Sequence, residues 1–491
     1  MMAHLASTRL VWFILAASVL QQSLGHLNGD VSWLITVCER LLDGGTAYVD
    51  VLETNPPASW LIYMPAVSLA QLIAVAPEPI VAASIFAFGV LSLHLCSKLV
   101  ALPPTERQLF LNALAALIFF MPGFSFAERE HVAVMAALPV LCLWSLPSHQ
   151  RVDIALRLAT AVLASLTIII KPHFALVIGL PLLWRAVVLR RWLLLVSREP
   201  LVIAACVLAY VALVIWRYRD FFDALPMLLE TYVPIRAPMQ DVLTSGWFVT
   251  HLCLAVLVLL HAMRRRLPLH VWQLFWGSLG FQFAYLMQMK GWTNHGLPGV
   301  TLVAASAFLL ILPHLTRMVA GEQSAALRRV VLMGVMPAGL FIMLLFGATL
   351  QFGGFEPYPG LSQAVRAAHP KPTIMSLTSA LDVGHPVTRA VGARWVGRAH
   401  SSWMAIYARI LIYKTAPEPQ LRQRLEAYIE RDIAIFVEDV TDAKPDLILI
   451  DDDGYTEELM IHPKIRAVMQ PYEPIGHASG ITIWGRSRAR A

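Results

Sequence analysis

The chain has 491 residues, of which 57% are hydrophobic and only 14% are charged. Soluble domains carry about 25% charged residues, so this composition excludes an ordinary soluble protein. The formal net charge is +6. The basic residues lie mainly at the ends of apolar runs, where the orientation of membrane helices explains them better than nucleic-acid binding does.

Long apolar runs alternate with short polar loops along most of the chain. With their flanks, most runs reach the roughly 20 residues that a helix needs to cross a bilayer. The first run, Leu10–Leu24, is predicted to be an uncleaved helix, because no small-x-small cleavage site follows it and many spans come after. We predict an all-α polytopic membrane protein with about eleven transmembrane helices. Further runs are Val81–Lys98, Val132–Leu146, Leu201–Trp216, Val249–Met263 and Val330–Leu350.

The apolar run Pro57–Ile73 decides the topology. If it crossed the membrane, the basic clusters Arg190–Arg191, Arg264–Arg266 and Arg328–Arg329 would all lie outside. Because Lys and Arg favour the cytoplasmic side, this run is predicted to lie along the surface or fold back. The N-terminus is then cytoplasmic. We predict a membrane domain over residues 1–351, with its first outside loop at 26–78, and a periplasmic α/β domain over 352–491, in a bacterial inner membrane.

Ionisable and aromatic residues gather at the predicted outside turns. Each one by itself fits a purely structural role, such as a snorkelling cation, a helix cap or a member of the aromatic belt. Together they favour one cavity of carboxylates, cations and a tryptophan, which suits an anionic substrate. The candidates are Asp30, Glu53, Arg129, Glu130, His131, Lys171, His173, Lys290, Trp292 and His295.

The order of these motifs resembles the GT-C glycosyltransferases, which use polyprenyl-phosphate sugars and include protein O-mannosyltransferases and lipid A aminoarabinose transferases. The resemblance rests on His26-Leu-Asn-Gly-Asp30 after the first helix, on Asp50-Val-Leu-Glu-Thr-Asn-Pro-Pro57, and on Glu128-Arg-Glu-His131. It also extends to a proteobacterial branch with Arg-Glu-His, Lys-Pro-His and Lys-Gly-Trp…His motifs. Many relatives carry two acids one residue apart in the first loop, whereas Asn28-Gly29-Asp30 offers one. This departure argues against a bound divalent metal, and no cofactor is assigned.

The resemblance implies roles for the candidate residues. Asp30 and Glu53 are the catalytic carboxylates, acting as general base or orienting the acceptor. The cations bind the donor phosphate, the histidines donate hydrogen bonds to it, and Trp292 stacks on the sugar. The predicted reaction is an inverting transfer from a polyprenyl-phosphate donor to a glycan, lipid or protein acceptor. The donor-binding set is Arg129, Glu130, His131, Lys171, His173, Lys290, Trp292 and His295.

Two other functions share parts of this pattern. A transporter or flippase would place its ionisable residues deep inside helices, whereas these candidates cluster at one face. A polymerase or ligase for lipid-linked glycans would use the same donor lipids, and the sequence does not separate it from a transferase. No nucleotide-binding glycine-rich loop occurs in the chain.

The C-terminal segment has the pattern of a small α/β domain. Charged residues are frequent there and apolar runs are short. The run Asp451–Asp453 is predicted to be a solvated turn rather than a metal site. Predicted elements are a helix at Gln420–Glu438 and strands at Pro372–Thr378, Asp446–Ile450 and Ile481–Trp484.

Overall fold

The computed structural model describes residues 2–147, 150–319 and 357–487. The chain forms two compact units from interleaved stretches. The bundle unit comprises Met1–Gly25, Val81–Leu213 and Ala237–Gln351, and the sheet unit comprises His26–Ile80, Val214–Arg236 and Phe352–Ala491. The predicted span Val330–Leu350 and the predicted boundary at residue 351 lie outside the described residues.

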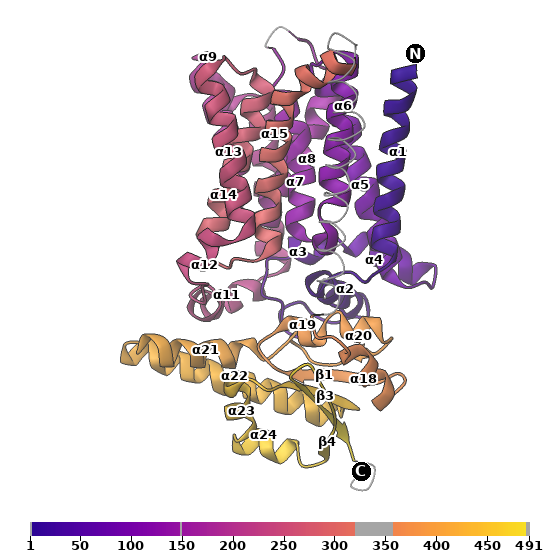
Figure 1. The fold of residues 1–491 in the computed structure, drawn as a ribbon. Coiled ribbons are helices and arrows are strands. Elements are labelled where there is room, and N and C mark those ends of the chain that lie inside the picture. The colour runs from indigo at the N-terminus through magenta and orange to yellow at the C-terminus, as the bar shows by residue number, and fades with distance from the viewer. Residues whose placement is uncertain (1, 148–149, 320–356, 488–491) are drawn as a thin grey trace. The chain divides into compact units, whose positions relative to one another are not determined.

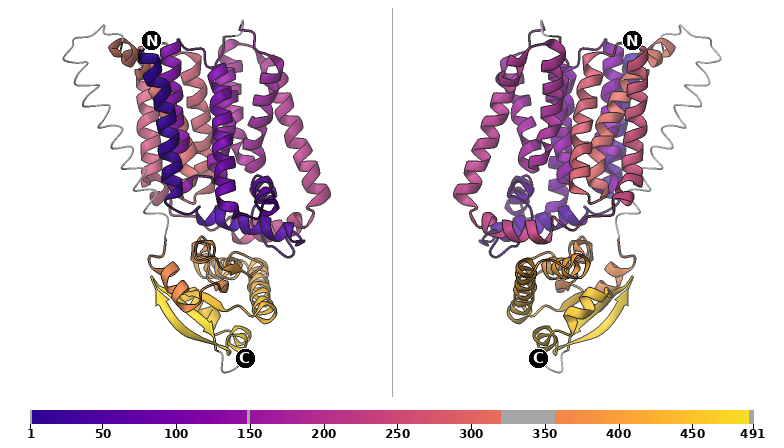
Figure 2. Two further views of the ribbon diagram at one scale, coloured as in Figure 1. Left: turned by 90° about the vertical axis from the view of Figure 1, so that its right-hand side faces the viewer. Right: turned by 90° about the vertical axis from the view of Figure 1, so that its left-hand side faces the viewer.

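The bundle unit consists of long apolar helices that run alongside one another (Figures 1 and 2). Short 3₁₀ and π segments occur between several of them at Ala116–Phe120, Gly123–Ser125, Pro172–Phe174 and Trp192–Val196. The helices are α1 (Met2–Ser23), α5 (Pro77–Leu99), α6 (Pro104–Ala115), α7 (Arg129–Trp144), α8 (Ile154–Ile170), α9 (Ala175–Leu189), α10 (Arg198–Arg217), α12 (Met239–Thr244), α13 (Gly246–Arg264), α14 (Leu269–Gln288) and α15 (Thr293–Val319).

Helix α7 is the centre of this bundle, because every one of its residues is buried. It packs against α8, α9, α14 and α15. Helix α14 approaches α9 so closely that a Cβ atom at Gly280 would lie 2.5 Å from the backbone of Val177. Gly280 therefore permits a helix contact that any side chain would prevent.

The bundle unit has the helices of a multi-pass membrane protein. Five helical stretches in the described part of the chain are long and apolar enough to cross a bilayer, judged by length and composition. The stretches Leu10–Ser23 and Ile154–Ile170 are apolar but shorter. The predicted total of about eleven spans stays a prediction. The five are Pro77–Leu99, Pro172–Leu189, Trp192–Arg217, Gly246–Arg264 and Thr293–Arg317.

The sheet unit combines the first loop, a middle stretch and the C-terminal segment. The run Pro57–Ile73 forms α3 and α4 within it, and both helices are too short to cross a bilayer, as the charge pattern predicts. Its helices are α2 (Gly29–Leu42), α3 (Ala58–Leu61), α4 (Met64–Leu72), α11 (Asp220–Thr231), α18 (Leu361–Ala368), α19 (Leu381–Gly384), α20 (Val387–Ala390), α21 (Trp403–Thr415), α22 (Pro419–Ala443), α23 (Gly454–Met460) and α24 (Pro463–Val468).

A five-stranded sheet forms the core of the C-terminal segment, in the order β2-β1-β3-β5-β4. The three strands β2, β1 and β3 are parallel, while β5 is antiparallel to β3 and to β4. Strand β3 reads as a continuous apolar run because both of its faces are covered. The four predicted elements of this segment all occur, within a few residues. The strands are β1 (Thr373–Leu377), β2 (Arg394–Trp395), β3 (Leu447–Asp451), β4 (Tyr472–Ala478) and β5 (Ile481–Arg486).

Candidate functional site

A buried ion pair lies at the N-terminal end of α7 in the bundle unit. Glu130 has no exposed side-chain surface, and its Oε1 atom accepts a hydrogen bond from Lys171 Nζ. The same oxygen lies 3.3 Å from His295 Nε2. Lys171 Nζ also donates to Gln288 Oε1 at 3.3 Å. Residues from three stretches that are far apart in sequence, at position 130, at position 171 and at positions 288 and 295, thus meet around one charge.

The geometry leaves hydrogen-bonding capacity at this cluster, which we call the Glu130 cluster. When His295 Nε2 carries its proton toward Glu130, Nδ1 is an acceptor. Neither His295 Nδ1 nor Glu130 Oε2 has a hydrogen-bond partner among the described residues, although both atoms are buried. Buried polar groups in native proteins are nearly always satisfied, so two such atoms at one place point to a ligand or to water.

Further charges surround the Glu130 cluster. Arg129 is buried and lies within electrostatic range of both Glu130 and His295. The ring of Trp292 lies 5.2 Å from that of His295, and Lys290 Nζ lies 5.8 Å from the Trp292 ring centre. Trp292 is 43% exposed, so its ring is open to a binding partner. Three cations are near Glu130, and its neighbour in the chain, Glu128, adds a second carboxylate, which leaves a net positive neighbourhood.

The other two predicted histidines differ from His295. His131 Nδ1 accepts from the amide of Ala127 at 3.1 Å, so its Nε2 donates to the carbonyl of Ile118 at 2.6 Å. Both of its nitrogens are therefore used within the fold, which makes His131 a structural residue in this geometry. His173 is only half-buried, and its Nε2 atom has no partner among the described residues. It lies within electrostatic range of Lys171 and is therefore the better candidate.

Glu53, in the sheet unit, is held in a fixed orientation. The side chain is 5% exposed. Its Oε2 atom accepts from the indole nitrogen of Trp33, and its Oε1 atom accepts from the amide of Asn55 at 2.9 Å. In the described part of the chain Oε2 receives a single protein donor, so one of its lone pairs can accept a hydrogen bond from a ligand hydroxyl.

Glu53 lines a cavity of about 350 Å³ within the sheet unit, which we call the Glu53 cavity. Its apolar floor is the packed cluster of Met227, Leu228, Trp403 and Met404. This volume lies at the lower end of the range for small-molecule sites.

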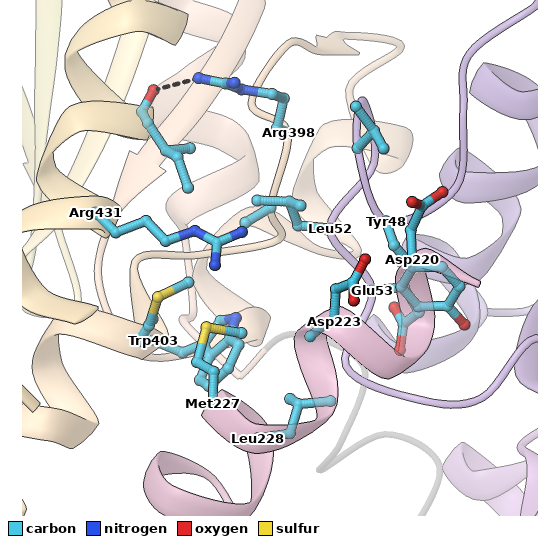
Figure 3. A pocket seen from close by; sticks show the side chains of 15 residues that line it. Tyr48, Leu52, Glu53, Asp220, Asp223, Met227, Leu228, Arg398, Trp403 and Arg431 are labelled. Atoms are coloured by element: carbon cyan, nitrogen blue, oxygen red, sulfur yellow. Dashed lines mark hydrogen bonds between the residues drawn. The ribbon is translucent and has the colours of Figure 1, made fainter. Parts of the chain in front are cut away.

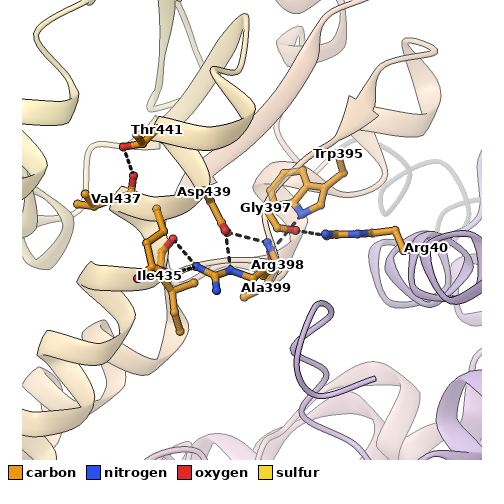
Figure 4. Close-up of polar contacts among 10 residues, drawn as sticks. Arg40, Trp395, Gly397, Arg398, Ala399, Ile435, Val437, Asp439 and Thr441 are labelled. Carbon is orange, nitrogen blue, oxygen red and sulfur yellow. Dashed lines mark hydrogen bonds and ion pairs between the residues drawn. The ribbon is translucent and has the colours of Figure 1, made fainter. Parts of the chain in front are cut away.

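The walls of the Glu53 cavity carry opposite charges. Asp220 and Asp223 of α11 stand near Glu53, and Arg431 of α22 reaches in toward Asp223 (Figure 3). Arg398 also lines the cavity, but it is tied down: its Nε atom donates to Asp439 at 2.6 Å and its Nη2 atom to Glu438 at 2.6 Å (Figure 4). Arg398 therefore has a structural role in the cavity wall. The charged side chains left to face a ligand are those of Glu53, Asp220, Asp223 and Arg431.

Asp30 lies in the first turn of α2, but it is not the helix cap that its position suggests. The cap is Asn28, whose side-chain oxygen accepts from the amide of Val31 at 2.9 Å. Asp30 is half-buried beside Asp382. Desolvation of its carboxyl and then the charge of Asp30 raise the pKa of Asp382, although the residue as a whole is exposed.

Each residue of the acidic run Asp451–Asp453 makes its own contacts within the fold. Asp451 accepts from Thr378, Asp452 from Thr482 and His477, and Asp453 caps α23 by accepting from the amide of Tyr455. Within the described ranges, no group of three or more histidines, cysteines or acids is arranged to hold a metal ion.

Sequence reasoning missed several residues of the Glu130 cluster and of the Glu53 cavity. Gln288 lies two residues before the flagged Lys290, and a polar residue at the end of an apolar helix is a weak signal. Asp220 and Asp223 lie in α11, on the long stretch between the apolar runs Leu201–Trp216 and Val249–Met263, and the length of that stretch was the available signal. Arg431 could not be distinguished from other solvated charges on a polar helix. The prediction that all candidate residues share one cavity stays a prediction.

No family model and no curated protein sequence matches this chain. Its fold, however, is that of solved proteins. The structure of ArnT from Cupriavidus metallidurans bound to undecaprenyl phosphate matches with a TM-score of 0.59 at 13% identity, covering 98% of each chain. The apo structure of the same protein matches with a TM-score of 0.55 at 14% identity, again over 98% of each chain. The predicted GT-C resemblance is confirmed at the level of the fold.

Proposed function

We propose that this protein is a membrane glycosyltransferase that moves a sugar from a polyprenyl-phosphate donor to a hydroxyl-bearing acceptor. The observation that carries the proposal is the Glu130 cluster, a buried and net positive site in an apolar bundle. The fold adds support, because an ArnT with this fold is bound to undecaprenyl phosphate. A lipid-linked phosphate needs cations next to an apolar surface, and a helical bundle supplies both.

The proposed donor site uses the residues around Glu130. Arg129 and Lys171 bind the donor phosphate, and Lys290 adds charge at the open side beside Trp292. Glu130 holds Lys171 in place in a setting where an unpaired ammonium would be costly. With the Nε2 proton directed at Glu130, His295 accepts a hydrogen bond through Nδ1, which suits a hydroxyl group of the sugar or a protonated phosphate oxygen.

The proposed acceptor site is the Glu53 cavity. Its carboxylates and Arg431 match the hydroxyl groups of a saccharide, which both donate and accept hydrogen bonds. Glu53 is the proposed general base, with Asp30 as the second candidate. The acceptor oxygen loses its proton to the base and bonds to the anomeric carbon, while the bond from that carbon to the phosphate oxygen breaks. Polyprenyl phosphate leaves, and a single displacement inverts the configuration.

The proposal includes a location. The charge pattern of the loops favours a bacterial inner membrane with the sheet unit on the periplasmic side. Lipid-linked sugars offered there need no nucleotide at the site, which agrees with the absence of a glycine-rich phosphate loop from the sequence.

The test is transfer of labelled sugar from a panel of polyprenyl-phosphate donors by the purified full chain in lipid. We expect Glu53→Gln to lower kcat at least about a hundredfold while donor binding persists, since a lost general base costs about 10²–10⁴ in rate. Glu473→Gln, an exposed carboxylate on β4, is the matched control and should leave transfer unchanged.

A donor-site variant completes the test. Lys171→Arg keeps a cation for Glu130 but moves its charge, so we expect the KM for donor to rise about tenfold or more with a smaller change in kcat. Wild-type protein that neither transfers sugar from any donor nor binds one would refute the proposal. Donor binding and transbilayer movement without transfer would instead identify a flippase.

A further inference from the structure

We propose that the bundle unit contains a second anion site, for a phosphate-type group, at the end of the helices opposite the Glu130 cluster. The site is a cavity of about 150 Å³ where α7, α8, α9 and α10 meet. It is independent of the proposed transfer reaction. The residues that carry the argument are Trp144, Arg157, Arg185, Arg191, Ser197 and Glu199.

Helix geometry separates this cavity, which we call the Arg185 cavity, from the Glu130 cluster. Glu130 is in the first turn of α7 and Trp144 is its last residue. At 1.5 Å of rise per residue, fourteen residues of helix place them about 21 Å apart. The neighbouring α8 gives the same result, because Arg157 is in its first turn and Lys171 follows its last residue. The two sites therefore cannot share one phosphate.

One ion pair gives the Arg185 cavity a fixed wall. Arg157 Nη1 lies 2.5 Å from Glu199 Oε1, and Glu199 Oε2 accepts from Ser197 Oγ at 3.4 Å. Glu199 is 4% exposed, so its charge is neutralised by Arg157 rather than by solvent. The remaining charge of the cavity comes from Arg185 and Arg191.

Apart from the amide of Gln150, which can both donate and accept, the remaining polar side chains that line the cavity are donors. The indole nitrogen of Trp144 is buried in a side chain that is 1% exposed, and it has no acceptor among the described residues. The Nε atom of Arg185 is also buried and has no acceptor among the described residues. Arg191 lies within electrostatic range of Arg185. Two guanidinium groups and an indole N–H offer no acceptor, so the ligand that completes their hydrogen bonds is an anion.

The volume limits the ligand to a small group. It is about five times the volume that one water molecule takes in the liquid, which admits a phosphate group. The phosphate of an anionic membrane lipid and free inorganic phosphate share this chemistry. A membrane edge that is merely basic would instead expose its arginines singly, with no buried indole donor among them.

The experiment measures ligand binding by the purified full chain. Native mass spectrometry counts retained lipid after exchange into phosphatidylglycerol or phosphatidylcholine, and thermal unfolding in neutral detergent is titrated with inorganic phosphate. We expect wild type to retain phosphatidylglycerol, to be stabilised by phosphate, or both. The double variant Arg185→Gln with Arg191→Gln should weaken this binding at least about tenfold. The single change Arg191→Gln, at an exposed residue, should weaken it less.

Two controls decide the outcome. Trp144→Phe keeps the packing and removes only the N–H group, so it should weaken binding severalfold. Arg264→Gln with Arg265→Gln removes the same charge from the exposed end of α13 and should change nothing. Binding of lipid alone or of phosphate alone identifies the source of the anion and supports the site. Binding of neither, or equal loss in the α13 control, overturns it.

Discussion

Glu130 and Asp432 are both buried carboxylates, but their hydrogen-bond and ion-pair partners differ. Glu130 has a cation, Lys171, against it. Asp432 is 4% exposed, and its Oδ2 atom accepts from the backbone amide of Ala405 at 2.7 Å, near the start of α21. Burial raises the pKa of Asp432 from 3.8 to about 7, since amide donors offset only part of the lost hydration. The first carboxylate is suited to a charged site and the second to a structural one.

The raised pKa of Asp432 predicts how stability depends on pH. Between about pH 4 and pH 7 the folded protein keeps a proton on Asp432 that the unfolded chain releases. The free energy of unfolding is therefore higher at low pH, and this gain is lost as the pH rises. We expect a contribution on the order of 4 kcal/mol across that window. Asp432→Asn should flatten the difference between thermal midpoints measured at pH 5 and pH 7. An unchanged difference would show that Asp432 does not titrate in this range.

Helix α2 shows how one element connects local sequence to the candidate acceptor site. Asn28 caps its first turn, and one turn later Trp33 projects from it to hold Glu53. The orientation of the proposed base therefore depends on where this helix begins.

The cap assignment can be checked by two neighbouring substitutions. Asn28→Ala removes the side-chain acceptor for the amide of Val31 and should lower the free energy of unfolding by about 1 kcal/mol. Asp30→Asn removes a charge that repels Asp382, so it should leave stability unchanged or slightly raised. Thermal unfolding in detergent compares the two variants. A larger loss of stability in Asp30→Asn than in Asn28→Ala would identify Asp30 as the cap.

The same element shows what sequence could predict. The alternation of spans and loops was visible, because it is local. Asn28 and Asp30 are both good capping residues, and only the backbone geometry at Asn28 separates them. The contact of Lys171 with Glu130 was beyond local pattern, although both residues were candidates. The Glu53 cavity was further out of reach, because it joins positions 53, 223 and 431 from three stretches of chain.

At the scale of the whole molecule, ion pairs connect the stretches of the sheet unit. Arg389 donates from Nη1 to Glu39 at 2.7 Å and from Nη2 to the same carboxylate at 3.0 Å, and it also pairs with Glu78. Arg40 donates to the carbonyl of Gly397 at 2.5 Å (Figure 4). These contacts join residues 26–80 to the C-terminal segment.

Loss of the Arg389 contacts should loosen the first loop. In Arg389→Gln we expect faster amide hydrogen exchange across residues 26–80, because two carboxylates lose a half-buried partner. Arg394→Gln, an exposed arginine five positions along, serves as the control. Equal exchange in both variants would mean that apolar packing alone holds the loop.

The interleaved sheet unit has a consequence for the order of events during synthesis. The Glu53 cavity takes its acids from the first and middle stretches and its arginine from position 431. At about 5–20 residues per second, the ribosome adds Arg431 on the order of half a minute after Glu53. Until then the early stretches lack the partner surface against which they fold. A chain cut short between α15 and α22 would therefore carry the described bundle helices without a complete Glu53 cavity, so this site is completed only after α22 has been synthesised.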